Sequence, residues 1–278
     1  MDNCFCEAVH SKACKSILQV KKLSSNIASR AELGRTPLYP YVIGSVLRYW
    51  YKLHFQTKSP ILKQAYISEL NFKSLGKSSW LSPIMDIQDI STWNFGKNRV
   101  SSLIKKVISN VQMQYKINIL TYLKELQKEG TNDKLRTYCH IKSDYSIEPY
   151  LLKQIRQSCR SKITSLRIGS HSLDSEVGRY QNPPIPPESR FCRFCLPDKF
   201  IGDECHFLTK CSLFDEKRIE LFNSLKLGNI FYNQNDRNKF IILMTSMLKK
   251  DDSCLKIARY IYECFKLHSS HRNGTSSG

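Results

Sequence analysis

The sequence lacks the segments that would place it in a membrane or export it. No apolar run approaches the ~18 residues of a membrane span, and the most apolar one, Phe240-Ile-Ile-Leu-Met, is interrupted by Thr245 and Ser246. The chain begins Met-Asp-Asn-Cys-Phe-Cys, without the basic and then apolar regions of an export signal. It also has no lipidation motif and no isolated polybasic run. We therefore expect an intracellular protein that does not span a membrane.

The motifs of common catalytic sites are missing as well. There is no Gly-rich phosphate loop, no His-Glu-x-x-His and no Gly-x-Ser-x-Gly. The adjacent Asp251 and Asp252 follow Lys249-Lys250 between two predicted helices, whereas a polymerase carboxylate pair needs an aromatic-x-Asp-Asp turn between apolar strands. We expect no catalysis by this chain on its own and no small-molecule substrate.

Acidic residues are scarce relative to basic ones. The chain has 24 Asp and Glu against 43 Lys and Arg, which gives a formal net charge of +19. Such an excess attracts polyanions, and nucleic acid is the commonest polyanion inside a cell. A solvated basic surface without a partner is the alternative. The hydrophobic content of 41% is that of a globular protein, and 278 residues are long enough for two folded units.

The hydrophobic pattern is helical along most of the chain, because apolar residues recur three or four positions apart. It predicts helices at residues 8–20, 25–32, 41–55, 60–70, 100–128, 150–167, 213–225, 240–248 and 254–266. Only residues 135–141 and the short run before Cys192 favour strands. The predicted fold is therefore mainly α, with a helical body followed by a small zinc-centred module and C-terminal helices.

A proline-rich connector divides this pattern. Residues 178–182 lead into Pro183-Pro184-Ile185-Pro186-Pro187, a sequence that favours a stiff, extended segment. We predict a helical region at 1–180, a zinc-binding module with packing helices at 181–268 and a polar, disordered tail at 269–278.

Four residues with metal-ligand chemistry follow the connector: Cys192, Cys195, His206 and Cys211. The spacing C-x2-C-x10-H-x4-C supplies three thiolates and one imidazole, a set that Zn²⁺ binds tetrahedrally. The first pair can chelate from one tight turn, and the second lies one short loop away, so closing the site costs little chain entropy. Four protein ligands leave no position for substrate, which indicates a structural metal rather than a catalytic one.

Other readings of the cysteines stay open. Eleven cysteines can produce this spacing by chance, or serve as buried thiols. An odd count in a reducing compartment favours ligands and inert thiols over disulfides. Cys205 directly precedes His206 and is an alternative third ligand. Near the start of the chain, a second cluster is either a metal site or a small apolar stripe on one helix face: Cys4, Cys6, His10 and Cys14.

The predicted helix at 150–167 combines an apolar stripe with a basic face. The stripe consists of Leu152, Ile155, Cys159, Ile163 and Leu166. Four cations lie on the adjoining face at ~100° per residue, and no acidic residue interrupts 151–168: Lys153, Arg156, Arg160 and Arg167. We predict that these four contact phosphates. The alternative is a solvated face whose arginines pair with acids elsewhere.

The metal motif and its context resemble the C-terminal region of reverse transcriptases encoded by LINE-type, non-LTR retrotransposons of animals. The resemblance rests on Asp203-Glu204-Cys205-His206-Phe207-Leu208-Thr209-Lys210-Cys211, followed by Phe214 and Arg218. Other short segments between Val9 and Phe265 also resemble that region and follow one another in the same order as in it. Among them are Glu32-Leu33-Gly34-Arg35-Thr36-Pro37-Leu38, Glu176-Val177-Gly178-Arg179-Tyr180 and Ala258-Arg259-Tyr260-Ile261-Tyr262.

The resemblance implies a piece that lies downstream of the polymerase fingers and palm, with ligand roles for the four metal-motif residues. The polymerase aspartate turn and the endonuclease are absent, so the family's activity does not carry over. The expected function is sequence-tolerant binding of RNA, DNA or both. The gap of ten between Cys195 and His206 exceeds the four of retroviral nucleocapsid knuckles, and Phe191, Phe194 and Phe207 are either stacking faces or core. The alternatives are a zinc-braced protein-interaction module and a non-functional retroelement remnant.

Overall fold

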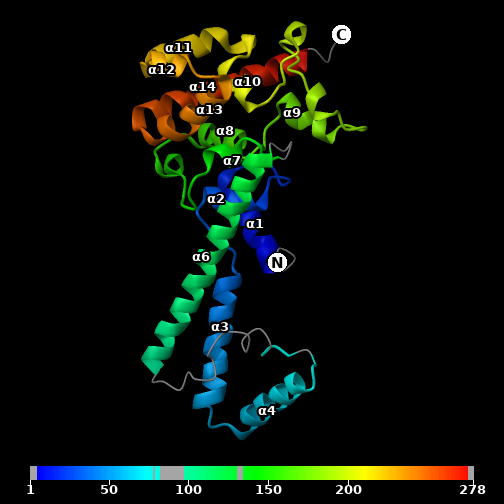
Figure 1. The fold of residues 1–278 in the computed structure, drawn as a ribbon, viewed down its shortest axis with the longest axis vertical. Coiled ribbons are helices and arrows are strands. Elements are labelled where there is room, and N and C mark those ends of the chain that lie inside the picture. The colour runs from blue at the N-terminus through cyan, green and yellow to red at the C-terminus, as the bar shows by residue number, and fades with distance from the viewer. Residues whose placement is uncertain (1–4, 78, 82–96, 130–133, 275–278) are drawn as a thin grey trace. The chain divides into compact units, whose positions relative to one another are not determined.

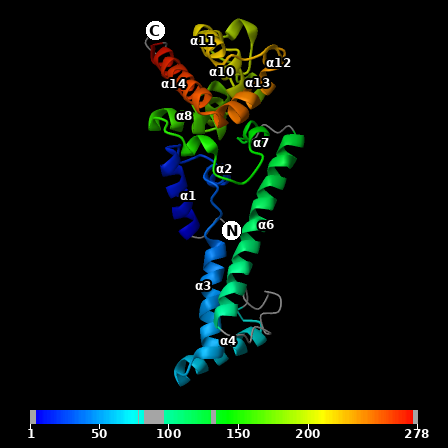
Figure 2. The ribbon, with the colours of Figure 1, turned by 90° about the vertical axis from the view of Figure 1, so that its left-hand side faces the viewer.

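The structure is a computed structural model that describes residues 5–77, 79–81, 97–129 and 134–274. Helices make up most of it (Figures 1 and 2). Among the described residues the β pairing consists of two isolated bridges, Leu33 with Ile147 and Phe191 with Ile201. The mainly α fold is therefore confirmed. The chain divides into two compact units, the first formed by 1–7 and 36–118 and the second by 8–35 and 119–278.

The first unit is built on α3 (Tyr39–Tyr51), α4 (Pro60–Ser74) and the first part of α6 (Lys97–Glu129). A π-helical turn at Lys52–Gln56 follows α3. Helices α3 and α6 run side by side (Figures 1 and 2) and share a core that includes Trp50 and Ile104. Gly44 lets them approach closely, because a Cβ there would lie 2.3 Å from Cδ1 of Ile108. Ser59 caps α4 by accepting a hydrogen bond from the Leu62 amide.

The second unit contains the remaining helices, although the first residues of α1 belong to the first unit. They are α1 (Phe5–Leu18), α2 (Asn26–Glu32), α7 (Tyr138–Ile141), α8 (Gln157–Arg167), α9 (Asp174–Val177), α10 (Glu204–Thr209), α11 (Asp215–Leu225), α12 (Asn229–Tyr232), α13 (Asp236–Ile242) and α14 (Asp251–Gly274). Helix α14 packs against α8 and α11, and α10 packs against α13. A π-helical turn at Leu243–Met247 follows α13.

A buried ion network lies in the core of the second unit. Arg167 pairs with Glu32 at 3.0 Å and with Glu148 at 2.7 Å, and its guanidinium also donates to the Met244 carbonyl at 2.6 Å. The side chains of Arg167 and Glu32 are both 0% exposed. Burial alone would lower the pKa of Arg167, but the two carboxylates outweigh burial and raise it. The network ties α2 and α8 to the turn that follows α13.

The predicted helix at 150–167 is wrong in its first half. Residues Pro149–Leu152 form a 3-10 helix, Lys153 and Arg156 have extended ψ angles of 154° and 131°, and α8 begins at Gln157. The Arg160 guanidinium stabilises this turn by donating to the carbonyls of Lys153 and Ile155, both at 3.1 Å. Leu152 is consequently 70% exposed and lies outside the apolar stripe.

Three other predictions need correction or comment. Residues 135–141 form turns and α7 rather than a strand, since the amides of Cys139 and Lys142 bond to carbonyls four residues earlier. Helix α14 continues to Gly274, so residues 269–274 of the predicted disordered tail are helical, and 275–278 lie outside the described residues. The boundary predicted near residue 180 falls inside the second unit.

None of the helices within the described ranges is both long and apolar enough to cross a membrane.

Candidate metal centre

The four predicted ligands come together in the second unit. One ligand atom each from Cys192, Cys195, His206 and Cys211 lies within 4.8 Å of the others, and all four residues are buried. The Sγ atom of Cys211 is 3.8 Å from that of Cys192 and 3.9 Å from that of Cys195. A tetrahedral ion with metal–sulfur bonds of about 2.3 Å places its sulfurs about 3.8 Å apart. The group is thus close enough to hold a metal ion.

A tight turn positions the first two thiols. The Cys192 amide donates to the Phe200 carbonyl at 2.7 Å, and the Cys195 amide donates to the Cys192 carbonyl at 3.1 Å. Gly202 closes the loop opposite this turn, because a Cβ there would lie 3.1 Å from Cα of Cys192. The sequence Cys-x2-Cys therefore folds into one compact chelating loop, as its spacing predicts.

Helix α10 positions His206. Asp203 caps this helix by accepting a hydrogen bond from the His206 amide at 2.8 Å. The imidazole is buried, and its ring nitrogens have no hydrogen-bond partner outside the ligand group, within which the ring interacts with the Cys192 thiol. A buried polar nitrogen without a partner is costly, and a metal ion would satisfy one of the two. This observation favours His206 as a ligand independently of its spacing.

Backbone amides also support two of the thiols. Phe194 donates to the Cys192 sulfur, and Leu213 donates to the Cys211 sulfur, each from two residues further along the chain. Cys192 also shares a hydrogen bond with Cys211, and this bond is the largest influence that holds the Cys192 pKa well below its usual range and raises that of Cys211. The pair therefore favours one thiolate, on Cys192, and metal binding would release the proton of Cys211.

Charged residues from outside the module hold its backbone. The Asp174 carboxylate accepts from the Arg193 backbone amide at 3.1 Å and from Nε of the same residue at 2.8 Å, so it clamps the turn between the first two cysteines. Glu204, at the start of α10, accepts from Arg136 at 2.8 Å and from His171 at 2.6 Å. Burial opposes ionisation of Glu204, but these neighbours prevail and lower its pKa to about 2. The metal-binding loops are thus fixed to residues upstream of the proline-rich connector.

The alternative ligands are not part of this group. Cys205 is buried beside His206, but its sulfur is absent from the cluster, and burial raises its pKa far above the usual thiol value. Among the described residues no metal-like group includes Cys6, His10 or Cys14. On α1, Cys6 is exposed whereas Cys14 is 1% exposed. Cys4 lies outside the described residues.

The three phenylalanines of the module differ in their surroundings. Phe207 is 2% exposed and packs against Phe214 and Phe265, with ring centroids 4.9 and 4.6 Å away; it belongs to the core. Phe194 is partly exposed and contacts His268 edge-on at 5.3 Å. Phe191 is partly exposed and forms the bridge with Ile201.

The four predicted phosphate contacts do not form one exposed face. Arg167 is buried in the ion network, which corrects its predicted role as a phosphate contact. Lys153 donates to the Lys249 carbonyl at 2.7 Å and pairs with Asp251. Arg160 folds back onto backbone carbonyls. Arg156, which is exposed at the start of α8, remains available to a ligand.

Sequence reasoning missed the residues that brace the metal-binding loops. The Asp203 cap has a local signal, since an aspartate precedes a short helical pattern. No local sequence signal identifies the other three, Asp174, Arg136 and His171, because each bonds to a partner more than fifteen residues away in the chain.

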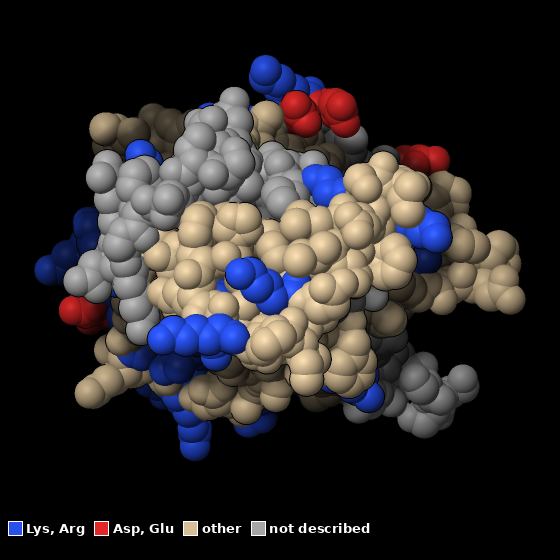
Figure 3. Space-filling model, turned by 90° about the horizontal axis from the view of Figure 1, so that it is seen from below, with Lys and Arg blue, Asp and Glu red and all other residues tan. Residues whose placement is uncertain are grey.

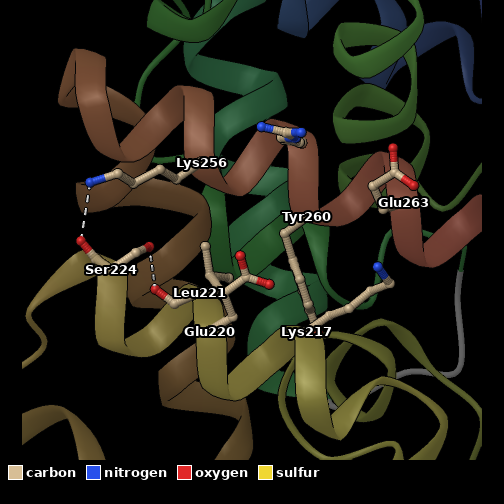
Figure 4. Close-up of a pocket in the computed structure, with 8 residues that line it drawn as sticks. Lys217, Glu220, Leu221, Ser224, Lys256, Tyr260 and Glu263 are labelled. Atoms are coloured by element: carbon tan, nitrogen blue, oxygen red, sulfur yellow. Dashed lines mark hydrogen bonds between the residues drawn. The ribbon is translucent and has the colours of Figure 1, made fainter.

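A cavity of about 500 Å³ lies between α11 and α14, away from the metal-ligand group (Figure 4). Its lining carries both signs of charge: Lys217, Glu220, Lys256, Arg259 and Glu263. Lys256 already donates to the Ser224 carbonyl at 3.1 Å, as Figure 4 shows, and to Asp252 at 2.6 Å. The balance of charges gives this cavity no clear ligand preference.

Comparison of the chain with protein-family models, with curated proteins and with solved structures gives no significant match in any of the three.

Proposed function

We propose that Cys192, Cys195, His206 and Cys211 hold one structural Zn²⁺, and that the chain is a nucleic-acid-binding fragment of a LINE-type retrotransposon reverse transcriptase without catalytic activity of its own. The observation that carries the zinc proposal is the geometry of the ligand group. Sulfur separations of 3.8 and 3.9 Å fit a tetrahedral zinc–thiolate site, and the His206 ring nitrogens lack any other partner. When bound, the metal supplies folding energy, about 10–16 kcal/mol in small zinc peptides at neutral pH.

The nucleic-acid proposal is supported by the excess of positive charge. The chain carries a net charge of +19, and Lys and Arg side chains are spread over the face in Figure 3. Arg156 adds an exposed cation on the second unit. Distributed cations favour contact with the phosphate backbone, which carries no sequence information, so we expect binding that tolerates sequence.

Salt dependence tests the nucleic-acid proposal. We expect the affinity of the zinc-loaded chain for single-stranded RNA or DNA to fall by at least tenfold between 50 and 200 mM salt, because each neutralised phosphate releases counterions. Arg156→Gln should lower the slope of log K against log salt by about 1. Lys12→Gln, which removes an exposed charge on α1, is the matched control. Indistinguishable affinities at the two salt concentrations would refute the proposal.

A second candidate function is favoured by exposed apolar side chains on α4 and just beyond it. They are Ile61, Leu62, Ile67, Phe72 and Leu75, with exposures between 42% and 80%. Exposed apolar side chains gathered on one helix are typical of a protein-docking surface, and the metal would then only brace the fold. This alternative predicts that Ile61→Ser with Phe72→Ser abolishes capture of a protein partner, whereas Arg156→Glu leaves it unchanged. The nucleic-acid proposal predicts the reverse pattern for oligonucleotide binding.

A further inference from the structure

A second concavity in the second unit has more basic than acidic side chains in its lining. Its volume is about 260 Å³, several times the ~30 Å³ share of one water molecule. Five basic side chains line it, from α7, the 3-10 helix after α9, the segment before Cys192, α13 and the chain after α6: Arg136, His140, Arg179, Arg190 and Arg237. The acidic side chains in its lining are Glu188 and Asp203.

Two of the arginines are already neutralised by neighbouring carboxylates. Arg136 pairs with Glu204 at 2.8 Å, and Arg179 pairs with Glu176 at 3.1 Å. One carboxylate oxygen of Asp203 accepts a hydrogen bond from the His206 amide, and Glu188 is exposed to solvent at the rim of the cavity. The acids of this region therefore leave positive charge on the remaining arginines.

Arg190 and Arg237 are the lining arginines that make no direct ion pair with a described carboxylate, although Glu176 and Glu188 attract Arg190 from a greater distance. Arg190 is 8% exposed, and its guanidinium donates to the carbonyls of Ile185 at 2.9 Å and Ser175 at 3.2 Å. Neither Arg190 nor Arg237 has a carboxylate within 4.0 Å in the part of the chain that the structure describes. Burial and the charges of Arg179 and Arg136 lower the pKa of Arg190. Burial and Arg237 lower the pKa of His140.

We propose that this cavity is an anion site that binds a phosphate group, with Arg190 and Arg237 as its principal donors. Arginine suits this role, because its planar fork donates two parallel hydrogen bonds to an oxyanion. The phosphate belongs either to a nucleic-acid phosphodiester or to a free phosphate. The first source rests on the proposed function, whereas the anion site itself does not.

The test uses the zinc-loaded full chain and inorganic phosphate, titrated calorimetrically against chloride at constant ionic strength. Arg237→Gln is the informative variant, because this side chain is exposed and has no ion pair to lose. We expect it to weaken phosphate binding about tenfold, the usual effect of losing one charge-assisted contact. Lys239→Gln removes the same charge from the same helix outside the cavity and should change the affinity by less than twofold. Circular dichroism checks that both variants fold.

The outcomes separate the two sources of phosphate. If Arg237→Gln weakens phosphate and oligonucleotide binding together, the site takes a phosphodiester. If phosphate binding falls and oligonucleotide binding does not, the site takes a free phosphate. Absence of phosphate binding in the wild type, or equal losses in Arg237→Gln and Lys239→Gln, would overturn the inference. A wild type that binds phosphate but no oligonucleotide would refute the proposed function and leave the anion site standing.

Discussion

Replacement of Arg167 by Gln should strongly destabilise the second unit. The change removes ion pairs with Glu32 and Glu148 and a hydrogen bond to the Met244 carbonyl, and it leaves Glu32 buried without a cation. Removing one partner of a buried pair costs about 3–5 kcal/mol. At about 2–4 °C per kcal/mol for a unit of this size, the melting temperature should fall by about 6–20 °C.

Thermal unfolding followed by circular dichroism measures this effect. Arg156→Gln is the matched control, since that exposed side chain makes no ion pair that the structure records, and it should shift stability by no more than about 0.5 kcal/mol. Glu32→Gln combined with Arg167→Gln should cost less than the sum of the single changes, because the two residues share one interaction. Equal melting temperatures for Arg167→Gln and Arg156→Gln would refute the assignment of Arg167 to the core.

Two further predictions concern the metal module and the anion site. Asp174→Asn should weaken metal affinity by roughly tenfold, because it loosens the clamp on Arg193. Chelator competition measures this affinity, and Asp198→Asn, at an exposed position, is the control. Equal metal affinities in the two variants would contradict the prediction. His140 has a lowered pKa in the folded state, caused by burial and Arg237, so the unfolded chain binds more protons below about pH 6.5. The neutral His140 imidazole therefore makes its full contribution to the free energy of unfolding above about pH 6.5, and this contribution is lost as the pH falls. His140→Gln should flatten the rise of urea stability between pH 5 and 7, and an unchanged slope would exclude this role.

Short-range patterns predicted the parts of this protein that depend on neighbours in sequence. The spacing of Cys192, Cys195, His206 and Cys211 identified the group that the structure brings together, because a tight turn and one short loop suffice to close it. Helical periodicity identified the mainly α fold for the same reason. Spacing alone left Cys205 and His206 as alternatives, and only the tertiary fold distinguishes them.

Features that depend on distant residues could not be predicted in this way. The basic face at 150–167 assumed an uninterrupted helix, but Arg160 bonds to the carbonyls of Lys153 and Ile155 and holds the backbone extended there. The sequence pattern placed Arg167 on an exposed basic face, but the residue is buried because it pairs with Glu32, which lies 135 residues earlier in the chain. The continuity of the second unit across residue 180 likewise rests on long-range pairs such as Arg136 with Glu204.

The metal content of the purified chain tests the central claim most directly. Elemental mass spectrometry should find about one zinc per chain in the wild type and in Cys205→Ser, and none in Cys211→Ser, whose sulfur contacts both other ligand thiols. Loss of α10 and the surrounding loops from the folded state should accompany the loss of metal in that variant. A folded wild-type protein without zinc, or equal zinc in Cys205→Ser and Cys211→Ser, would contradict the account.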